Sequence, residues 1–391
     1  MHLVFFTHPD FMGDQRMPAF ASMPRFARML AEGMRARGHQ VEMWAPRSRL
    51  FELPVTGGPK KWLGYVDQYL VFPMEVRQRL KHCPPDTLFV FADNALGPWV
   101  PLVADRPHVM HCHDFMAQRS ALGQIPENPT GWSGRQYQRM IRAGYSKGKH
   151  FISVSRKTRE ELHTFLPAPP LTSEVVYNGL SEALTPYDCT KARTMVGKAT
   201  GVELSHGYLL HVGGNQWYKN RLGVIELYNA WRSSSSIAVP LLLIGGPLTP
   251  ELNSVRDISP FKEDIHVVSG LDDELVHLAY AGATVFLFPS IAEGFGWPIA
   301  EAMASGCLVI TTGEAPMTEV AGEAGFLIPR RPHDEAQAVA WAAAAAKTID
   351  KVVHLPPAER SAAIAAGITN VARFNSENAL NRIEEIYKTI Q

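Results

Sequence analysis

The 391-residue sequence has few cysteines and no long apolar run. Its four cysteines, Cys83, Cys112, Cys189 and Cys307, include no Cys-x-x-Cys pair. This spacing argues against a disulfide framework or structural zinc site and fits a reducing compartment. No stretch approaches the roughly 20 apolar residues of a membrane-spanning helix. The early run at 3–6 is too short for a signal-peptide core, so we expect a cytoplasmic protein, or one at the inner face of a membrane.

Net charge is absent as well, because 38 Lys and Arg residues balance 38 Asp and Glu residues. Residues 1–188 carry 22 basic and 17 acidic residues, whereas the remainder carries 16 and 21. An excess this small argues against nucleic acid as a partner. The change of sign favours two domains with different partners, although chance placement of surface charge explains it equally well. The length agrees with two to three domains of about 150 residues.

Short apolar segments alternate with helical patterns along the whole chain. Strands are expected at 2–7, 40–44, 87–92, 108–112 and 151–154, and again at 208–212, 239–244, 266–268, 284–288 and 308–311. Helices are expected at 24–37, 222–231, 273–280, 298–304 and around the alanine run 342–346. Strands that alternate with helices predict an α/β fold with parallel sheets. The pattern starts afresh after 187, and the segment 168–205 is rich in Pro, Thr and Ser, so we expect the domain boundary there.

The most specific segment, 290–303, follows an expected strand and begins a helix. Gly294 and Gly296 leave backbone N–H groups uncovered just before that helix. Because a helix N-terminus carries partial positive charge, the segment suits a phosphate or diphosphate. Glu293 and Glu301 flank it, and carboxylates beside an anion site make sense as acceptors for sugar and ribose hydroxyl groups.

Two other interpretations of this segment are open. The string Gly294-Phe295-Gly296 begins a dinucleotide fingerprint, but Ile299 occupies the sixth position where glycine or alanine is needed. Alternatively, the glycines only form a turn and Glu301 lies on a helix surface.

The string 293–303, continued to residue 310, resembles the donor-site signature of retaining GT-B glycosyltransferases of family 4. The resemblance implies two Rossmann-like domains that face a cleft, an acceptor domain at 1–187 and a nucleotide-sugar donor domain at 188–372. A C-terminal helix at 373–391 would pack back on the first domain. The implied enzyme is a hexosyltransferase that moves a sugar from a nucleotide sugar to an acceptor hydroxyl in bacterial polysaccharide or glycoconjugate assembly.

The resemblance also assigns the donor site. Glu293 would hold the donor sugar and Glu301 the nucleotide ribose. Lys219 matches a lysine that members place on the donor diphosphate. The arginine that often precedes this lysine is missing, and Arg221 follows it instead. Further donor contacts are expected from Gly213, Gly214, Asn215, Asn220, Gly245, Leu271, Gly294, Phe295, Gly296 and Trp297.

In the first half, the resemblance places a histidine beside the donor sugar at the end of a strand. His113 is the matching position, so we expect it to be catalytic together with Glu293 and Lys219. Two alternatives are a metal site with His111, as in metal-dependent hydrolases, and a structural histidine in the core. Acceptor contacts are expected from Asp114 and from Gly13, Asp14 and Arg16 in the N-terminal loop, which lacks the Gly-Gly pair of many family members.

The expected partners follow from the same resemblance. They are a nucleotide sugar and a saccharide or lipid-linked saccharide acceptor. Arg135, Arg139 and Arg142 share one face of a helical pattern that also contains Trp132 and Tyr137, which indicates either contact with anionic lipid or a solvated helix face.

No cofactor or metal is expected, because the sequence contains no Asp-x-Asp triplet, the usual metal handle of the other main glycosyltransferase fold. The rival functions are a GT-B sugar phosphorylase, a nucleotide-sugar epimerase, the metal-dependent hydrolase and a non-catalytic nucleotide-sugar binder.

Overall fold

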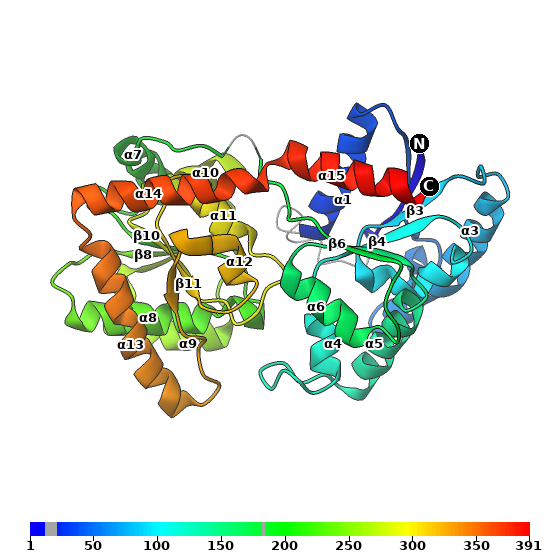
Figure 1. Ribbon diagram of the computed structural model, residues 1–391. Helices are drawn as coiled ribbons and strands as arrows, with labels where there is room; N and C mark the ends of the chain where they lie inside the picture. The colour runs from blue at the N-terminus through cyan, green and yellow to red at the C-terminus, as the bar shows by residue number, and fades with distance from the viewer. Residues whose placement is uncertain (12–21, 182–183) are drawn as a thin grey trace. The chain divides into compact units, whose positions relative to one another are not determined.

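The computed structural model describes residues 1–11, 22–181 and 184–391, which form two compact units (Figure 1). Unit 1 comprises Met1–Ile125, Pro129–Tyr177 and Glu377–Gln391, and unit 2 comprises Pro126–Asn128 and Asn178–Ser376. Each unit contains a six-stranded sheet in which every strand pair is parallel. The predicted α/β fold with two Rossmann-like sheets is confirmed.

The sheet of unit 1 has the strand order β2-β1-β3-β4-β5-β6. The strands are β1 (His2–Phe6), β2 (Gln40–Trp44), β3 (Leu88–Phe91), β4 (His108–Cys112), β5 (His150–Ser153) and β6 (Thr172–Val175). All residues of β3 and β4 are buried, as both faces of a parallel sheet are covered, and this explains their continuous apolar runs. Because the strands run in the same direction, the segments that follow them meet at one edge.

Helices cover the sheet of unit 1. They are α1 (Ser22–Ala36), α2 (Gly58–Val66), α3 (Phe72–Leu80), α4 (Met116–Ala121), α5 (Trp132–Tyr145), α6 (Arg156–Phe165) and α15 (Ser376–Ile390), with a π-helical turn η3 (Asp67–Val71) and a 3-10 segment η4 (Asn94–Leu102). Pro98 and Pro101 lie inside η4, and a proline lacks the N–H that an α-helix interior needs. The carboxylate of Asp93 caps η4 by accepting a hydrogen bond from Ala95 N at 3.0 Å.

The helix α15 belongs with unit 1 although it ends the described chain, and Figure 1 shows it beside α1. A Cβ on Gly33 of α1 would lie 2.7 Å from Leu380 Cδ1, so a larger residue here would force the Leu380 side chain of α15 to move. Tyr387 is fully buried, and its hydroxyl shares a 2.7 Å hydrogen bond with His111 Nε2 of β4. These contacts tie the last helix to the first sheet.

The sheet of unit 2 has the order β12-β11-β10-β7-β8-β9. Its strands are β7 (Leu209–Val212), β8 (Leu241–Ile244), β9 (Ile265–Val268), β10 (Val285–Phe288), β11 (Val309–Thr312) and β12 (Phe326–Ile328). Its helices are α7 (Cys189–Thr200), α8 (Arg221–Ser234), α9 (Pro250–Asp257), α10 (Asp273–Gly282), α11 (Trp297–Ala304), α12 (Met317–Ala321), α13 (Glu335–Val353) and α14 (Pro357–Val371).

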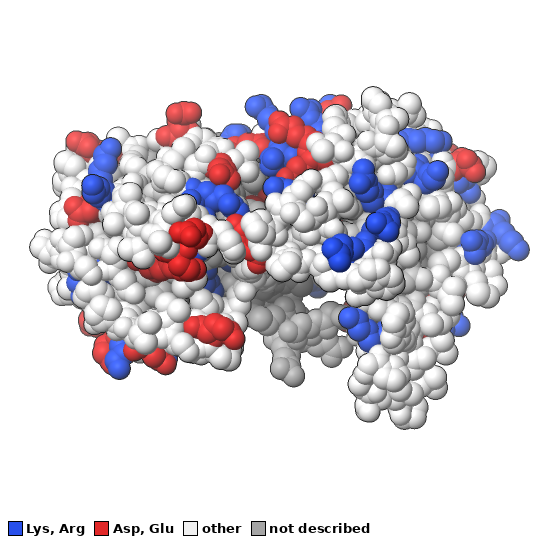
Figure 2. All heavy atoms as spheres, turned by 90° about the horizontal axis from the view of Figure 1, so that it is seen from below, with Lys and Arg blue, Asp and Glu red and all other residues white. Residues whose placement is uncertain are grey.

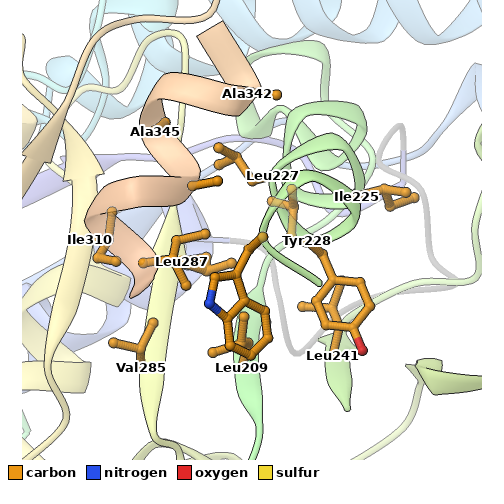
Figure 3. Packing of buried hydrophobic residues seen from close by; sticks show 14 of the residues in the cluster. Leu209, Ile225, Leu227, Tyr228, Leu241, Val285, Leu287, Ile310, Ala342 and Ala345 are labelled. Carbon is orange, nitrogen blue, oxygen red and sulfur yellow. The ribbon is translucent and has the colours of Figure 1, made fainter. Parts of the chain in front are cut away.

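One core cluster of unit 2 lies between this sheet and the helices α8 and α13 (Figure 3). Leu227 and Tyr228 of α8 lie over Leu209 and Leu241 of the sheet, and the small Ala345 brings α13 close. The alanine run 342–346 thus forms a helix interior, as predicted.

The predicted strands and helices are present in both units, with ends shifted by a few residues. Two strands were not predicted, β6 and β12. β6 reads Thr-Ser-Glu-Val at the sheet edge and all four of its residues are only partly buried, so it has no apolar run to detect. β12 has three residues.

Candidate active site

Glycine-rich loops follow the adjacent strands β10, β7 and β8 of unit 2 at the carboxyl edge of the sheet. Gly213 follows β7 and Gly245 follows β8. The φ angle of Gly245 is 148°, and a Cβ there would lie 2.1 Å from Gly213 O. Only glycine allows the two loops to touch in this way. In open α/β sheets, ligands bind at this edge.

The predicted donor-binding residues all lie in the loops after β7, β8, β9 and β10 or at the first residues of the helices that follow: Gly213, Gly214, Asn215, Lys219, Asn220, Gly245, Leu271, Gly294, Phe295, Gly296 and Trp297. Glu301 lies one turn further along, inside α11.

The loop before α11 presents a helix N-terminus at this edge. Gly296 has a φ of 106°, and α11 begins at Trp297 with Pro298 in its first turn. Phe295 is buried and its ring packs edge-on against Phe374 at 5.3 Å, which fixes the loop. The first backbone N–H groups of a helix have no partner within the helix, so this terminus suits an anion.

Lys219 and Glu293 form an ion pair in front of these loops. The Nζ atom of Lys219 lies 2.8 Å from Glu293 Oε1, and the two side chains are 15% and 8% exposed. The ammonium also lies 5.0 Å from the centre of the Phe288 ring. The edge therefore offers a cation for a phosphate and a carboxylate for hydroxyl groups, side by side.

Glu301 is held from the neighbouring helix, because the Tyr280 hydroxyl donates a 3.3 Å hydrogen bond to Glu301 Oε2. Tyr280 itself is buried in α10.

Two predicted donor contacts, Asn215 and Asn220, also support the loops. Asn220 has a left-handed φ of 55°; its Oδ1 accepts from Gly223 N at the start of α8, and its Nδ2 donates to Pro289 O. Asn215 Nδ2 donates to Pro247 O at 2.6 Å. The polar atoms of Asn220 thus join β10 to α8.

Arg221 is the basic residue that the sequence offers in place of the missing arginine, on the other side of Lys219, and the structure places it beneath the edge. It is 2% exposed, and its Nη1 donates to Asn215 Oδ1 and to Gly246 O, which links the loops after β7 and β8. Burial lowers the pKa of Arg221 to about 10. His211 lies under Gly213; burial lowers its pKa to about 3, so the ring is neutral at pH 7.

In unit 1, His113 and Asp114 follow β4 at the carboxyl edge. His113 is buried; its Nε2 donates to Ala92 O at 2.9 Å and its ring packs edge-on against Phe26. Burial lowers the pKa of His113, which keeps the ring neutral. The Oδ1 atom of Asp114 caps α4 by accepting from Met116 N.

His111 does not join His113 in a metal-ligand set. It bonds Tyr387 instead, and no group of three or more His, Cys, Asp or Glu side chains suited to a metal ion occurs among the described residues. Gly13, Asp14 and Arg16, the other predicted acceptor contacts, lie outside the described residues.

A histidine–aspartate pair at the same edge was not predicted. His8 follows β1 and Asp93 follows β3, the neighbouring strand, and His8 Nε2 donates to Asp93 Oδ2 at 2.8 Å. Burial disfavours the charge on His8, but the hydrogen bond to Asp93 and the attraction of its carboxylate raise the pKa of His8 overall. The sequence could have indicated this pair, because both residues are polar and closely follow buried strands.

Family models match both halves of the chain. Residues 206–346 match Glycosyl transferases group 1, and residues 23–183 match Glycosyltransferase Family 4. The chain belongs to the GT-B glycosyltransferases. These matches confirm the resemblance to GT-B glycosyltransferases of family 4 that residues 293–310 indicate.

Characterised relatives of this glycosyltransferase include mannosyltransferases. O-antigen chain mannosyltransferase B of Escherichia coli is 27% identical over 186 residues, 47% of this chain and 46% of that protein. The aligned part is thus about half of that relative's length. Phosphatidyl-myo-inositol mannosyltransferase of Mycobacterium leprae is 26% identical over 378 residues, 92% of this chain and 91% of that protein.

Solved structures confirm the GT-B fold. Sucrose-phosphate synthase of Thermosynechococcus elongatus superposes with a TM-score of 0.73 at 18% identity, covering 100% of this chain and 99% of that chain. HepE of Anabaena, solved in complex with UDP and glucose, gives 0.72 at 16% identity with 100% of both chains covered.

Proposed function

We propose that the chain transfers a sugar from a nucleotide-sugar donor to an acceptor hydroxyl, with retention of anomeric configuration, during glycan assembly. The observation that carries this proposal is the Lys219–Glu293 pair at the glycine-rich edge of unit 2. A diphosphate gains negative charge as it leaves a sugar, and an ammonium placed beside it stabilises that charge. The carboxylate next to it accepts hydrogen bonds from the sugar hydroxyls.

In this proposal each loop has one task. The backbone N–H groups around Gly213 and Gly294–Gly296, with the N-terminus of α11, hold the diphosphate. Glu301 accepts from the ribose, and His113, a neutral hydrogen-bonding ring, orients the sugar. The bond between the anomeric carbon and the phosphate oxygen breaks while the acceptor oxygen bonds to the same face. The leaving phosphate takes the acceptor proton. Since Lys219 and the N–H groups balance the diphosphate charge, we expect transfer to persist in EDTA.

The relatives and the solved complex guide the choice of donor. Because two relatives are named as mannosyltransferases and HepE was solved with UDP and glucose, GDP-mannose and UDP-glucose are the first donors to test. A bound donor raises the thermal midpoint by mass action.

Variants of the pair test the proposal. Glu293→Gln and Lys219→Ala are each expected to lower transfer at least about 100-fold while the protein stays folded. The matched controls are Glu263→Gln and Lys262→Ala, two exposed residues of the same unit, which are expected to retain activity. Full activity of both site variants would refute the assignment. Strict dependence on added phosphate, or an isomerised donor as the only product, would indicate a phosphorylase or an epimerase.

Peripheral membrane contact through unit 1 is part of the proposal. Among the described residues no helix is long and apolar enough to cross a bilayer. Trp132, 71% exposed, and Arg135 lie on α5, while Trp62, 69% exposed, lies on α2. The Tyr65 and Tyr137 rings join the two helices at 6.3 Å.

Tryptophans and basic residues on one surface are typical of contact with anionic lipid. In Figure 2, basic residues predominate over the unit drawn on the right, which is unit 1. Arg142 is an exception to the predicted basic face, because its Nε donates to Phe165 O. Such a surface would bring a cytoplasmic enzyme to lipid-linked acceptors at the inner face of the membrane. The test is sedimentation with phosphatidylglycerol vesicles, with phosphatidylcholine vesicles as the control. Absence of binding to both kinds of vesicle would contradict the proposed membrane contact.

A further inference from the structure

The short stretch of chain that leads from β10 to Glu293 is held on one side by the loop after β7. Asn220 Nδ2 donates to Pro289 O at 2.8 Å, and the backbone N–H of Ile291 donates to Tyr218 O at 2.7 Å. The loop after β7 also supplies the ammonium of the ion pair with Glu293. These bonds therefore hold the two segments that carry the pair beside each other.

The same stretch is held on its other side by the ends of β11 and β12, which follow β10 in the order of the sheet. Thr312, the last residue of β11, donates from Oγ1 to Ser290 O at 2.7 Å. Arg330, which lies shortly after β12, donates from Nε to Ile291 O at 3.3 Å. Each of the three backbone carbonyl groups that precede the Glu293 loop thus accepts a hydrogen bond from a side chain.

Arg330 is the support that needs a partner of its own. Asn220 and Thr312 are buried, whereas the side chain of Arg330 is 33% exposed. A long, partly exposed side chain has several rotamers, and holding one of them costs entropy. Arg330 Nη2 donates to Glu127 Oε1 at 2.6 Å, a charge-assisted hydrogen bond. This ion pair holds the guanidinium where its Nε reaches Ile291 O.

Glu127 lies in Pro126–Asn128, a segment of unit 2 whose neighbours in the chain belong to unit 1. The Glu127 side chain is only 10% exposed, and a carboxylate that is largely buried is costly without a cation. A second carboxylate, that of Glu314, lies 4.0 Å from Arg330 Nε but is 56% exposed, so it contributes little. Glu127 is therefore the carboxylate that fixes Arg330.

We propose that Arg330 and Glu127 are positioning residues for Glu293, and that they control how tightly the donor site recognises the sugar of a nucleotide sugar. Both act through the backbone of Ile291 and not through contact with the donor. The effect on sugar recognition rests on the proposed function, in which Glu293 accepts from the sugar hydroxyls. The support of residues 289–291 does not rest on it.

The first test compares a nucleotide sugar with its own nucleotide, because a nucleotide without a sugar makes no use of Glu293. Titration calorimetry on the full chain, without acceptor, uses GDP-mannose against GDP and UDP-glucose against UDP. Arg330→Met and Glu127→Gln are each expected to weaken binding of the nucleotide sugar about three- to tenfold. Each is expected to change the affinity for the nucleotide by less than about twofold. Equal losses for both ligands would indicate general damage to the unit and overturn the proposal.

The second test asks whether Arg330 acts through Glu293. In a protein that already carries Glu293→Gln, Arg330→Met is expected to add less than about a twofold loss in affinity for the nucleotide sugar, because the two changes affect one interaction. Losses that multiply in full would show that Arg330 acts elsewhere and would also overturn the proposal. The matched control is Glu314→Gln, which is expected to leave both affinities unchanged.

Hydrogen exchange of residues 289–296 measures the positioning without any ligand. Exchange is expected to rise at least about threefold in Arg330→Met and in Glu127→Gln, and to stay unchanged in Glu314→Gln. Unchanged exchange in the first two variants would overturn the positioning role. Faster exchange in a protein whose wild type binds neither nucleotide sugar would support that role and count against the proposed function.

Discussion

The Nζ atom of Lys219 and the Oε1 atom of Glu293 lie 2.8 Å apart, and both side chains are largely buried. Each group holds the other in place before any ligand arrives. A diphosphate that binds beside Lys219 would share this ammonium with the carboxylate. The pair therefore holds both groups in position for a ligand. It also means that removing one charge leaves the other buried without its partner.

A double-mutant cycle measures this dependence. Lys219→Met leaves a carboxylate that is mostly buried without its cation, so we expect it to lower the free energy of unfolding by about 1–3 kcal/mol. Lys219→Met combined with Glu293→Gln is expected to be more stable than Lys219→Met alone. Urea unfolding of the four proteins checks this, and additive losses would show that the two groups do not interact.

Gly245 is expected to be irreplaceable for a steric reason. Gly245→Ala forces a Cβ to within 2.1 Å of Gly213 O and should separate the loops after β7 and β8. We expect a loss of stability of about 2–4 kcal/mol and loss of the thermal shift with nucleotide sugar.

Gly270→Ala is the control for Gly245→Ala. Gly270 also has a positive φ, 78°, but no atom lies within 4 Å of the added Cβ. Gly270→Ala introduces the strain of a positive φ without a steric clash, so we expect a smaller loss of stability. The difference between the two variants then measures the cost of the close approach at Gly245. Equal losses in the two variants would remove the steric explanation.

The His8–Asp93 pair predicts a stability difference that depends on pH. The pKa of His8 is raised, so its contribution is complete below the ordinary pKa of about 6.5 and disappears as pH rises through the folded value. Although burial opposes its charge, Asp93 has a lowered pKa through its bond with His8, so its contribution is present above its ordinary pKa and disappears in acid.

His8→Leu is therefore expected to be destabilising by about 1 kcal/mol near pH 6, with allowance for screening of the partly exposed ring, and less so near pH 9. Unfolding curves at several pH values check this. The exposed His82→Leu serves as the control and is expected to show no such trend.

Tyr387→Phe tests the attachment of α15. It leaves Nε2 of the buried His111 without its hydrogen bond, and we expect a loss of about 1–3 kcal/mol. Burial lowers the pKa of His111 to about 3, so this ring also weakens the fold as pH falls from about 6.5 toward 3. Hydrogen exchange of residues 377–391 should rise in the variant; unchanged exchange would show that packing alone holds the helix.

The residues of the proposed donor site could be brought together from the sequence because most of them are local in sequence. Glycines directly after buried strands, and a carboxylate on either side of a helix start, identify the edge of unit 2 without any knowledge of packing. The family resemblance indicated Lys219 as a residue of this site. Its contact with Glu293 joins residues 74 positions apart in the sequence, so only the structure reveals it.

The other features depend on packing between distant segments. Arg221 follows Lys219 in the sequence, yet it turns beneath the loops because α8 begins there and buries it. The close approach of η4 and α5 in unit 1 depends on Gly97 and Gly144, two glycines that carry no signal individually. His8 and Asp93 become neighbours only through the order of the strands, in which β1 lies next to β3.

The position of α15 in the sequence, after unit 2, has a consequence for synthesis of the chain. Leu380, Ile383 and Tyr387 are buried with unit 1, yet they are translated after the whole of 178–376. During synthesis, the residues of unit 1 that α15 covers therefore stay uncovered until residues 377–391 have been made.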